Sequence, residues 1–280
     1  MALSRDVKAG HRVDTGAGET SFFDLGPRDA PVLLFVHGWA SIAAEVLPLA
    51  ERLGRDFRLI APNWPGIEGS SPLAVYSMRA LVDWLEEFSG RLGLASFALA
   101  GHSLGGHLAL RFALAHPERV SRLVLLAPAG ITGEEGKIKA RAAKRPLLVR
   151  LMLALMGPGV FAFFSYAGIY HRRPRADHGL IAREARAWTS PQAKSVLAAI
   201  TLGVLDTDMV ESDLRGVKPP TLLIWGREDR LLPFRHAKTF LERLPAGAAL
   251  AAIEGCGHVA HLEKPDETSR AIAEFLSSSC

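Results

Sequence analysis

A serine stands between two glycines in the segment Gly101-His102-Ser103-Leu104-Gly105, directly after the apolar run Phe97-Ala100. A serine held in a tight, strained turn needs small neighbours, because a Cβ there would collide with the adjoining strand and helix. Such a turn presents the hydroxyl as a nucleophile. Because the chain has 26 glycines, the pattern alone arises readily by chance, and its meaning depends on the surrounding residues.

A serine hydroxyl attacks well only when a histidine takes its proton, and that histidine needs an acid to hold its ring. Asp229 follows the apolar run Thr221-Trp225, and His258 follows the run Ala249-Ile253. These residues occur in the order serine, acid, histidine, each after an expected parallel strand, so they should meet at one edge of the sheet. We therefore expect a catalytic triad of Ser103, Asp229 and His258.

Neighbouring residues compete for two of these roles. His261 lies just beyond His258, but His258 directly follows a glycine-rich turn and is the preferred base. Glu228 precedes Asp229, and we expect it to be solvated. His107 follows the serine turn and is expected to face outward along a helix.

The oxyanion that develops in acyl transfer needs backbone N–H donors. One should come from Leu104, the residue after the serine, and the second from Trp39, in the turn after the run Val32-Val36. The Trp39 side chain can also pack. We expect the substrate to be bound by His37, Gly38, His102, Met156, Phe163, Phe164 and Val259.

Short apolar runs alternate with longer helical patterns, which is typical of a parallel sheet covered by helices. The expected strands are Val32-Val36, Phe57-Ala61, Phe97-Ala100, Leu123-Leu126, Thr221-Trp225 and Ala249-Ile253, with Thr20-Leu25 as an antiparallel edge. The expected helices outside the insertion are Ala44-Leu53, Met78-Leu92, Leu104-His116, Arg235-Leu244 and Pro265-Leu276.

About ninety residues separate the runs that end at Leu126 and begin at Thr221, far more than the roughly one or two dozen that a parallel crossover needs. Helical patterns fill this insertion at Gly136-Met156, Val160-Ile169, Leu180-Trp188 and Pro191-Leu205. We expect a core domain of residues 1–128 and 211–280 and a helical cap of residues 129–210. Apolar side chains between Leu147 and Tyr166 would cover an acyl pocket.

Charge is unevenly placed along the chain. The net charge is only +4, but residues 130–190 hold 11 Lys and Arg against 4 Asp and Glu. This basic insertion lacks the interleaved aromatics of a nucleic-acid site, so no nucleic-acid partner is expected. The apolar run is preceded by five basic residues, Lys137, Lys139, Arg141, Lys144 and Arg145. They favour either contact with an anionic membrane surface or simple solvation.

Two cysteines are too few for a disulfide framework, and residues 1–13 lack an apolar run of signal-peptide length, so we expect a cytoplasmic protein. The longest apolar stretch, Leu147-Tyr170, is interrupted by Arg150 and by Gly157-Pro158-Gly159. These interruptions disfavour a membrane-spanning helix. A monomer or homodimer is expected.

The ordered motifs resemble those of the α/β-hydrolase superfamily over nearly the whole chain. The matching segments are His37-Gly38-Trp39, Pro62-Gly66, the Ser103 turn, Trp225-Asp229, and Gly257-His258 followed by Glu263-Lys264-Pro265. The resemblance implies an α/β fold with an eight-stranded, mostly parallel sheet and a helical cap after the sixth strand. The loop after Ala61 departs from the pattern, with Asn63 where aspartate is usual and Glu68 where a second glycine is common.

A serine nucleophile argues against the epoxide hydrolases and haloalkane dehalogenases of this fold, which form an ester on aspartate. We expect a carboxylesterase that acts on small-molecule esters with short to medium acyl chains and uses no metal or organic cofactor. The same triad also suits carbon–carbon cleavage of a vinylogous diketone, or hydrolysis of a thioester or lactone. A non-catalytic small-molecule receptor is the remaining alternative.

Overall fold

The computed structural model describes residues 9–131, 145–171, 176–205 and 213–278. These residues form an eight-stranded sheet with the order β1-β2-β4-β3-β5-β6-β7-β8. The first two strands and the β2–β4 pair are antiparallel, and all other neighbours are parallel. The strands are β1 His11–Thr15, β2 Gly18–Leu25, β3 Val32–Val36, β4 Arg58–Pro62, β5 Phe97–His102, β6 Val120–Leu126, β7 Thr221–Gly226 and β8 Ala249–Ile253.

The central strands are apolar because helices cover both of their faces. Every residue of β5 and of β7 is buried, which is the pattern of parallel strands inside an α/β sheet. β1 was not expected from the sequence, since its residues are mostly polar and four of the five are at least partly exposed. The expected α/β fold with a mostly parallel, eight-stranded sheet is confirmed.

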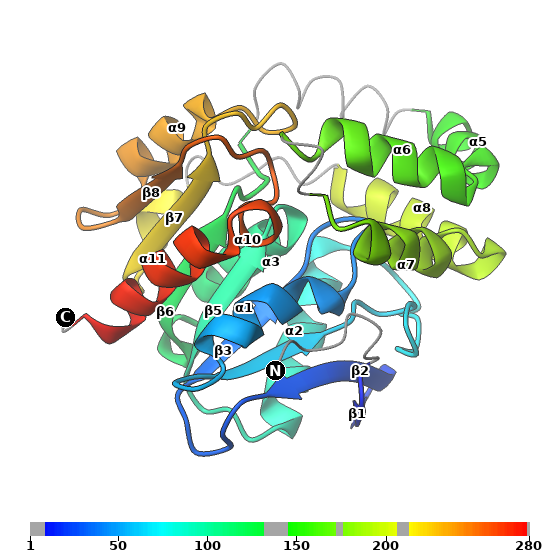
Figure 1. Ribbon diagram of the computed structural model, residues 1–280. Helices are drawn as coiled ribbons and strands as arrows, with labels where there is room; N and C mark the ends of the chain where they lie inside the picture. Colours follow the sequence, from blue (N-terminus) through cyan, green and yellow to red (C-terminus); the bar gives the residue numbers. More distant parts are fainter. Residues whose placement is uncertain (1–8, 132–144, 172–175, 206–212, 279–280) are drawn as a thin grey trace.

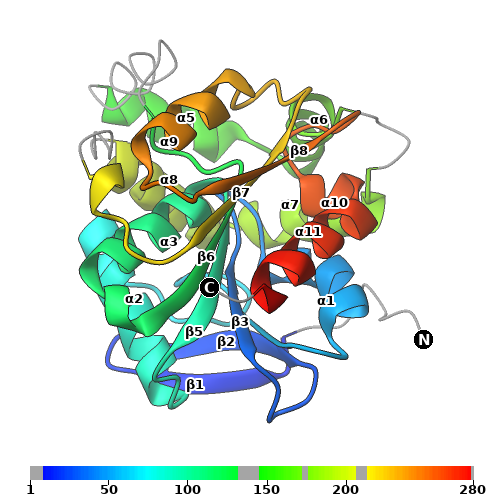
Figure 2. The ribbon, with the colours of Figure 1, turned by 90° about the vertical axis from the view of Figure 1, so that its left-hand side faces the viewer.

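Six helices cover the two faces of the sheet, and Figure 2 shows them on opposite sides of the strands. One face carries α1, α10 and α11, and the other carries α2, α3 and α9. Their bounds are α1 Leu47–Leu53, α2 Met78–Arg91, α3 Leu104–Ala115, α9 Arg235–Arg243, α10 Ala260–Glu263 and α11 Pro265–Ser277. Short 3-10 turns lie at Ala43–Val46, Pro117–Arg119 and Leu214–Gly216.

In the described part of the chain, four further helices follow β6 and precede β7, and we call them the inserted helices. They are α5 Pro146–Leu155, α6 Pro158–Gly168, α7 His178–Trp188 and α8 Pro191–Leu205. Three begin at a proline, whose fixed φ suits the first helical position. The expected helix Gly136-Met156 is confirmed from Pro146 onward, and its earlier part lies outside the described residues.

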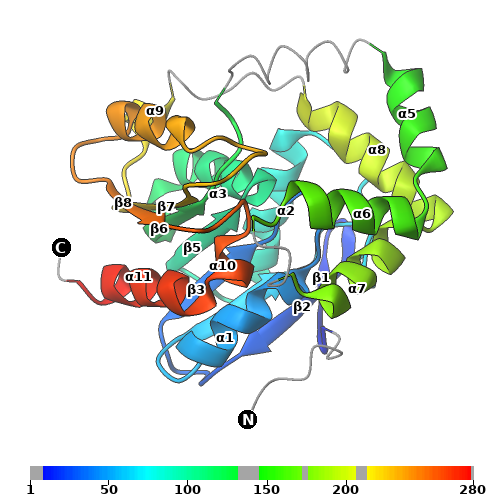
Figure 3. The same cartoon turned by 45° about the horizontal axis from the view of Figure 1, so that its top comes forward.

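The inserted helices lie together at one end of the sheet (Figure 1). α5 packs against α8, and α6 packs against α7. Figure 3 shows α5 beside α8 and α6 beside α7. In Figure 1, α5 and α6 lie above α7 and α8, which are nearer to the strands. The group lies at the end of the sheet at which β5 ends and α3 begins.

Candidate active site

Ser103 stands alone in the turn between β5 and α3. Its φ of 52° and ψ of −116° lie where non-glycine residues are rarely found. The flanking glycines make this turn possible: a Cβ on Gly101 would overlap the carbonyl oxygen of Gly105, and a Cβ on Gly105 would overlap that of Val36. The strained serine turn expected from the sequence is therefore present, and Ser103 is partly exposed in it.

A hydrogen bond of 2.7 Å joins Nδ1 of His258 to Oδ2 of Asp229, and both residues are buried. The other oxygen of Asp229 accepts the N–H groups of Leu231 at 2.9 Å and Leu232 at 2.8 Å. Nε2 of His258 has no hydrogen-bond partner among the described residues, so it is not bonded to Ser103 here. Such bonds commonly tighten only when substrate binds. A ring held by a carboxylate at Nδ1 offers Nε2 as a base.

The loop that carries His258 is tied to the inserted helices. The backbone N–H of His258 donates to the carbonyl oxygen of Ile169, just after α6, at 2.9 Å. The buried carboxylate of Glu263 accepts the N–H of Gly257 at 2.7 Å and that of His171 at 2.9 Å. Glu263 therefore bridges the loop and the chain that follows α6. The sequence motif around Glu263 was recognised, but this bridging contact was not foreseen.

The turn after β3 lies against the serine turn. A Cβ built on Gly38 would lie 3.0 Å from Nδ1 of His102 and 3.4 Å from Cβ of Ser103. Trp39 follows and is 44% exposed, while its indole N–H donates to Oγ1 of Thr201 on α8 at 2.9 Å. Leu104 is the first residue of α3, where backbone N–H groups lack partners within the helix. Both expected oxyanion donors thus belong to segments that adjoin Ser103.

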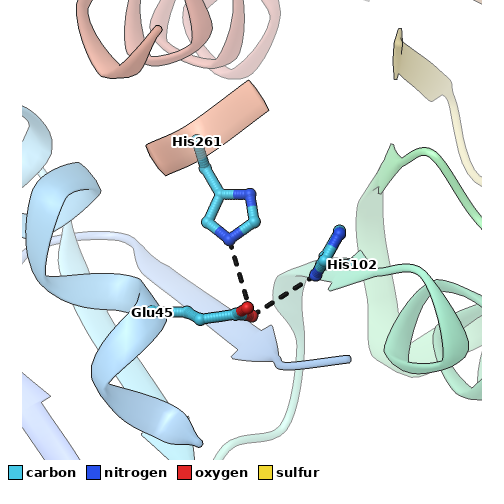
Figure 4. Close-up of side chains that lie close together, drawn as sticks. All are labelled: Glu45, His102 and His261. Atoms are coloured by element: carbon cyan, nitrogen blue, oxygen red, sulfur yellow. Dashed lines mark hydrogen bonds and ion pairs between the residues drawn. The ribbon is translucent and has the colours of Figure 1, made fainter. Parts of the chain in front are cut away.

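A buried carboxylate lies between two histidine rings next to the serine turn (Figure 4). Oε2 of Glu45 is 3.3 Å from Nδ1 of His102 and 3.5 Å from Nε2 of His261, the latter beyond ordinary hydrogen-bond length. The other ring nitrogen of His102 is 3.2 Å from the carbonyl oxygen of His258. Burial alone would raise the pKa of Glu45, but the two histidines outweigh it and hold this pKa well below its ordinary value.

These three residues are of types that also bind zinc, and their ligand atoms lie within 4.8 Å of one another. However, both nitrogens of His102 already face an oxygen of the protein, from Glu45 and from His258. We therefore interpret Glu45, His102 and His261 as an internal polar network that connects the turn Ala43–Val46 to the His258 loop.

Two histidines expected to bind substrate are engaged within the protein. Nδ1 of His37 lies 3.0 Å from the carbonyl oxygen of Gly38, and its Nε2 accepts the N–H of Trp64 at 3.2 Å. Burial lowers the pKa of His37 to about 4, so its ring is neutral near neutral pH. His102 is likewise occupied at both nitrogens. The polar atoms of these two rings hold the turns beside Ser103, and substrate contact by the rings stays a prediction.

Two of the aromatic residues expected to bind substrate are exposed. Phe163 and Phe164 are each 64% exposed. Phe163 lines a groove of about 340 Å³ with residues of α6 and α7, and Ser103 is not part of that lining. Met156 is half-buried against the main core, and Val259 is buried among residues of the inserted helices. The physical reason is that α5 and α6 pack mainly on α8 and α7, which leaves their other faces outward.

The expectation that His107 faces outward was wrong, and Glu228, expected to be solvated, is half-buried. His107 is buried, because α3 packs against β5, β6 and α2 at once. Glu228 uses its carboxylate to accept the N–H of Cys256 at 2.9 Å, so it fixes the loop that leads to His258. His261, the rival base, is fully buried and contacts Glu45, whereas His258 contacts Asp229.

The unusual loop after β4 is stabilised by the residues that depart from the common pattern. The amide of Asn63 donates to Oγ of Ser21 at 3.0 Å and accepts the N–H of Ala43 at 2.9 Å. Glu68 adopts a φ of 48°, and its carboxylate pairs with Arg183 of α7 at 2.7 Å. Glu68 thus adopts a strained left-handed backbone conformation that glycine adopts more easily, and its side chain links this loop to the inserted helices.

Comparison with known proteins identifies the family of this chain. The model of the alpha/beta hydrolase family matches residues 33–271. The chain belongs to this family. Among curated members, it is 28% identical to a 2-hydroxy-6-oxo-6-phenylhexa-2,4-dienoate hydrolase from Burkholderia cepacia, covering 91% of this chain and 90% of that protein. It is 27% identical to carboxylesterase YbfK from Bacillus subtilis, covering 94% and 86%.

Solved structures of the alpha/beta hydrolase family align closely with this chain. A bacterial membrane phospholipase A superposes with a TM-score of 0.80 at 27% identity, covering 95% of this chain and 84% of that one. The similar proteins therefore include a carboxylesterase, a phospholipase and a dienoate hydrolase.

Proposed function

We propose that this member of the alpha/beta hydrolase family hydrolyses carboxylic esters through an acyl-enzyme on Ser103. The observation that carries the proposal is the buried His258–Asp229 hydrogen bond of 2.7 Å, which leaves Nε2 of the ring free. Ser103 stands in a strained turn at the same end of the sheet, as a serine nucleophile requires.

The reaction follows from these positions. Oγ of Ser103 attacks the ester carbonyl carbon while Nε2 of His258 takes its proton, and Asp229 stabilises the imidazolium. The backbone N–H groups of Trp39 and Leu104 hold the oxyanion. The carbon–oxygen bond of the ester then breaks, and the leaving alcohol takes the proton from His258. Water, deprotonated by the same ring, attacks the acyl-enzyme and releases the acid and free Ser103.

The inserted helices act in this proposal as a cap made from residues 129–210 over the core. Support comes from contacts that cross between the two parts, such as Trp39 to Thr201 and His258 to Ile169. Short to medium acyl chains remain the expected substrates, and the esterase relative favours ester chemistry.

The direct test is hydrolysis of p-nitrophenyl esters of graded chain length by the wild-type chain and by Ser103→Ala. We expect kcat to fall by at least about a thousandfold in the variant. Ser195→Ala is the matched control, because this serine is exposed on α8 and bonds only within its helix. Full esterase activity in Ser103→Ala would refute the proposal.

A second candidate is carbon–carbon hydrolysis of a vinylogous diketone. The observation that favours it is the similarity to the dienoate hydrolase from Burkholderia cepacia over nine-tenths of the chain. Parallel assays with p-nitrophenyl esters and with a 2-hydroxy-6-oxo-dienoate distinguish the two. A kcat/KM that is higher for the dienoate by more than about tenfold would select the second candidate.

A further inference from the structure

The inserted helices expose many large apolar side chains. Of the eleven large hydrophobic residues exposed in the described part of the chain, eight belong to α5 and α6, with exposed fractions between 46% and 79%. We call this set the α5–α6 face. Its members are Leu147, Leu148, Leu151, Met152, Leu155, Val160, Phe163 and Phe164.

This surface is unusual for a helix pair on a folded protein. Only Leu153 of α5 and Phe161 and Ser165 of α6 are buried, so the two helices turn most of their apolar surface outward. Exposed apolar patches of this kind generally mark an interaction site. The α5–α6 face therefore requires a partner with an apolar interior.

The charged side chains within the segment that forms the face are all of one sign. Residues 145–170 contain no acidic residue, and their only charged side chains are Arg145 and Arg150, which are both exposed. Apolar side chains flanked by arginines suit a surface that is apolar inside and anionic outside. A symmetric contact between two copies would instead bring the arginines of both chains together with no acid in this segment to pair them.

The geometry of the two helices favours lying on a membrane over crossing it. Among the described residues no single helix is long and apolar enough to span a bilayer. The helices α5 and α6 reach that length and apolar character only together, and they are bent by 103° relative to each other. An apolar helix pair at this angle can bury its side chains at the headgroup boundary. We propose that the α5–α6 face binds the surface of an anionic lipid bilayer.

The sequence led us to expect that Lys137, Lys139, Arg141, Lys144 and Arg145 could touch such a surface. Of these, only Arg145 lies among the described residues. The present proposal rests instead on the apolar side chains of α5 and α6 and on the two arginines beside them. It does not depend on the proposed ester chemistry.

The test is co-flotation of the full chain with vesicles of phosphatidylcholine alone and of phosphatidylcholine mixed with phosphatidylglycerol. We expect binding to the mixed vesicles, weaker binding to the neutral ones, and a fall of the mixed-vesicle binding to the neutral level at high salt. The triple variant Leu147→Glu, Leu151→Glu, Leu155→Glu, whose positions repeat every fourth residue of α5, should lower the bound fraction at least about tenfold.

Val75→Glu is the matched control, because Val75 is 67% exposed but lies outside the inserted helices; it should bind like the wild type. Circular dichroism establishes that the variants are folded. Ser103→Ala should also bind vesicles normally. The membrane proposal can therefore hold even if the proposed ester hydrolysis is refuted. Absence of vesicle binding by the wild type, or equal binding by the folded triple variant, overturns the proposal. The proposal is also overturned if the wild type forms a dimer in gel filtration, the triple variant is a monomer, and the wild type does not bind vesicles.

Discussion

The carbonyl oxygen of Ile169 accepts the backbone N–H of His258 at 2.9 Å. Ile169 directly follows α6, and His258 is the residue that we propose as the base. The same loop is tied a second time through Glu263, which accepts N–H groups from Gly257 and His171. The position of the proposed base is therefore set partly by the inserted helices and not by the sheet alone.

Removal of the Glu263 carboxylate should loosen this connection. In Glu263→Ala the N–H groups of Gly257 and His171 lose their acceptor, and the His258 ring becomes less well positioned. Because small displacements of a base are costly, we expect kcat to fall about tenfold or more, with faster amide exchange at Gly257. Glu274→Ala, an exposed position on α11, is the control. Unchanged kcat and unchanged exchange in Glu263→Ala would argue against this coupling.

Asp229→Asn should preserve the fold and remove most of the activity. The amide oxygen can still accept from Leu231 and Leu232, but the amide N–H₂ then faces Nδ1 of His258 and selects the wrong tautomer. We expect kcat to fall by about 10³ to 10⁴ with little change in KM. Glu228→Gln, which keeps an acceptor for the N–H of Cys256, should retain most of its activity. A reversed ranking of the two variants would assign the acid role to Glu228.

Gly38→Ala should damage the site because the added Cβ would lie 3.0 Å from His102 and 3.4 Å from Ser103. We expect kcat to fall about tenfold or more, since the turn that carries the Trp39 N–H must move. Gly90→Ala, in the last turn of α2, is the matched control, because a Cβ there meets nothing within 4 Å. Wild-type kinetics in Gly38→Ala would exclude a close oxyanion turn.

Glu184 should make stability depend on pH in an unusual direction. Burial raises the pKa of Glu184, and the nearby charge of Glu45 raises it further. Above the ordinary value of 4.5 the unfolded chain loses this proton while the folded chain keeps it. The contribution of Glu184 to stability is therefore full at low pH and falls as pH rises toward the raised folded pKa, by about 1.4 kcal/mol for each pKa unit.

The variant Glu184→Gln tests this effect, because glutamine keeps an oxygen for the hydroxyl of Ser41, which donates at 2.6 Å. We expect the free energy of urea unfolding of the variant, relative to the wild type, to increase between about pH 4 and about pH 8. Glu118→Gln, at an exposed position, should show no such trend. A difference that is constant or decreases with pH would contradict the raised pKa.

The sequence predicted those features whose signal is local. The turn at Ser103 needs glycines at fixed positions, and the central strands need continuous apolar runs, so both could be read from neighbouring residues. β1 was missed because a polar edge strand is recognised mainly through its partner, as in the pairing of His11 with Phe22.

Contacts between distant segments could not be predicted in the same way. Glu45 and His102 are 57 residues apart, and nothing in the local pattern around Glu45 indicates a buried acid. The apolar residues of α5 and α6 were recognised, but their pattern does not say whether they face a pocket or the outside. Their direction depends on how α5 packs on α8 and α6 packs on α7.

The most direct test of the account is labelling with a fluorophosphonate, which reacts with a serine whose proton is taken by a neighbouring base. Mass spectrometry of the digested protein identifies the modified residue. We predict a single adduct on the peptide that contains Ser103, absent from Ser103→Ala and formed far more slowly in His258→Ala. An unlabelled Ser103 in a chain that hydrolyses esters, or equal labelling of Ser103→Ala at another residue, would contradict the assignment of Ser103 as the nucleophile.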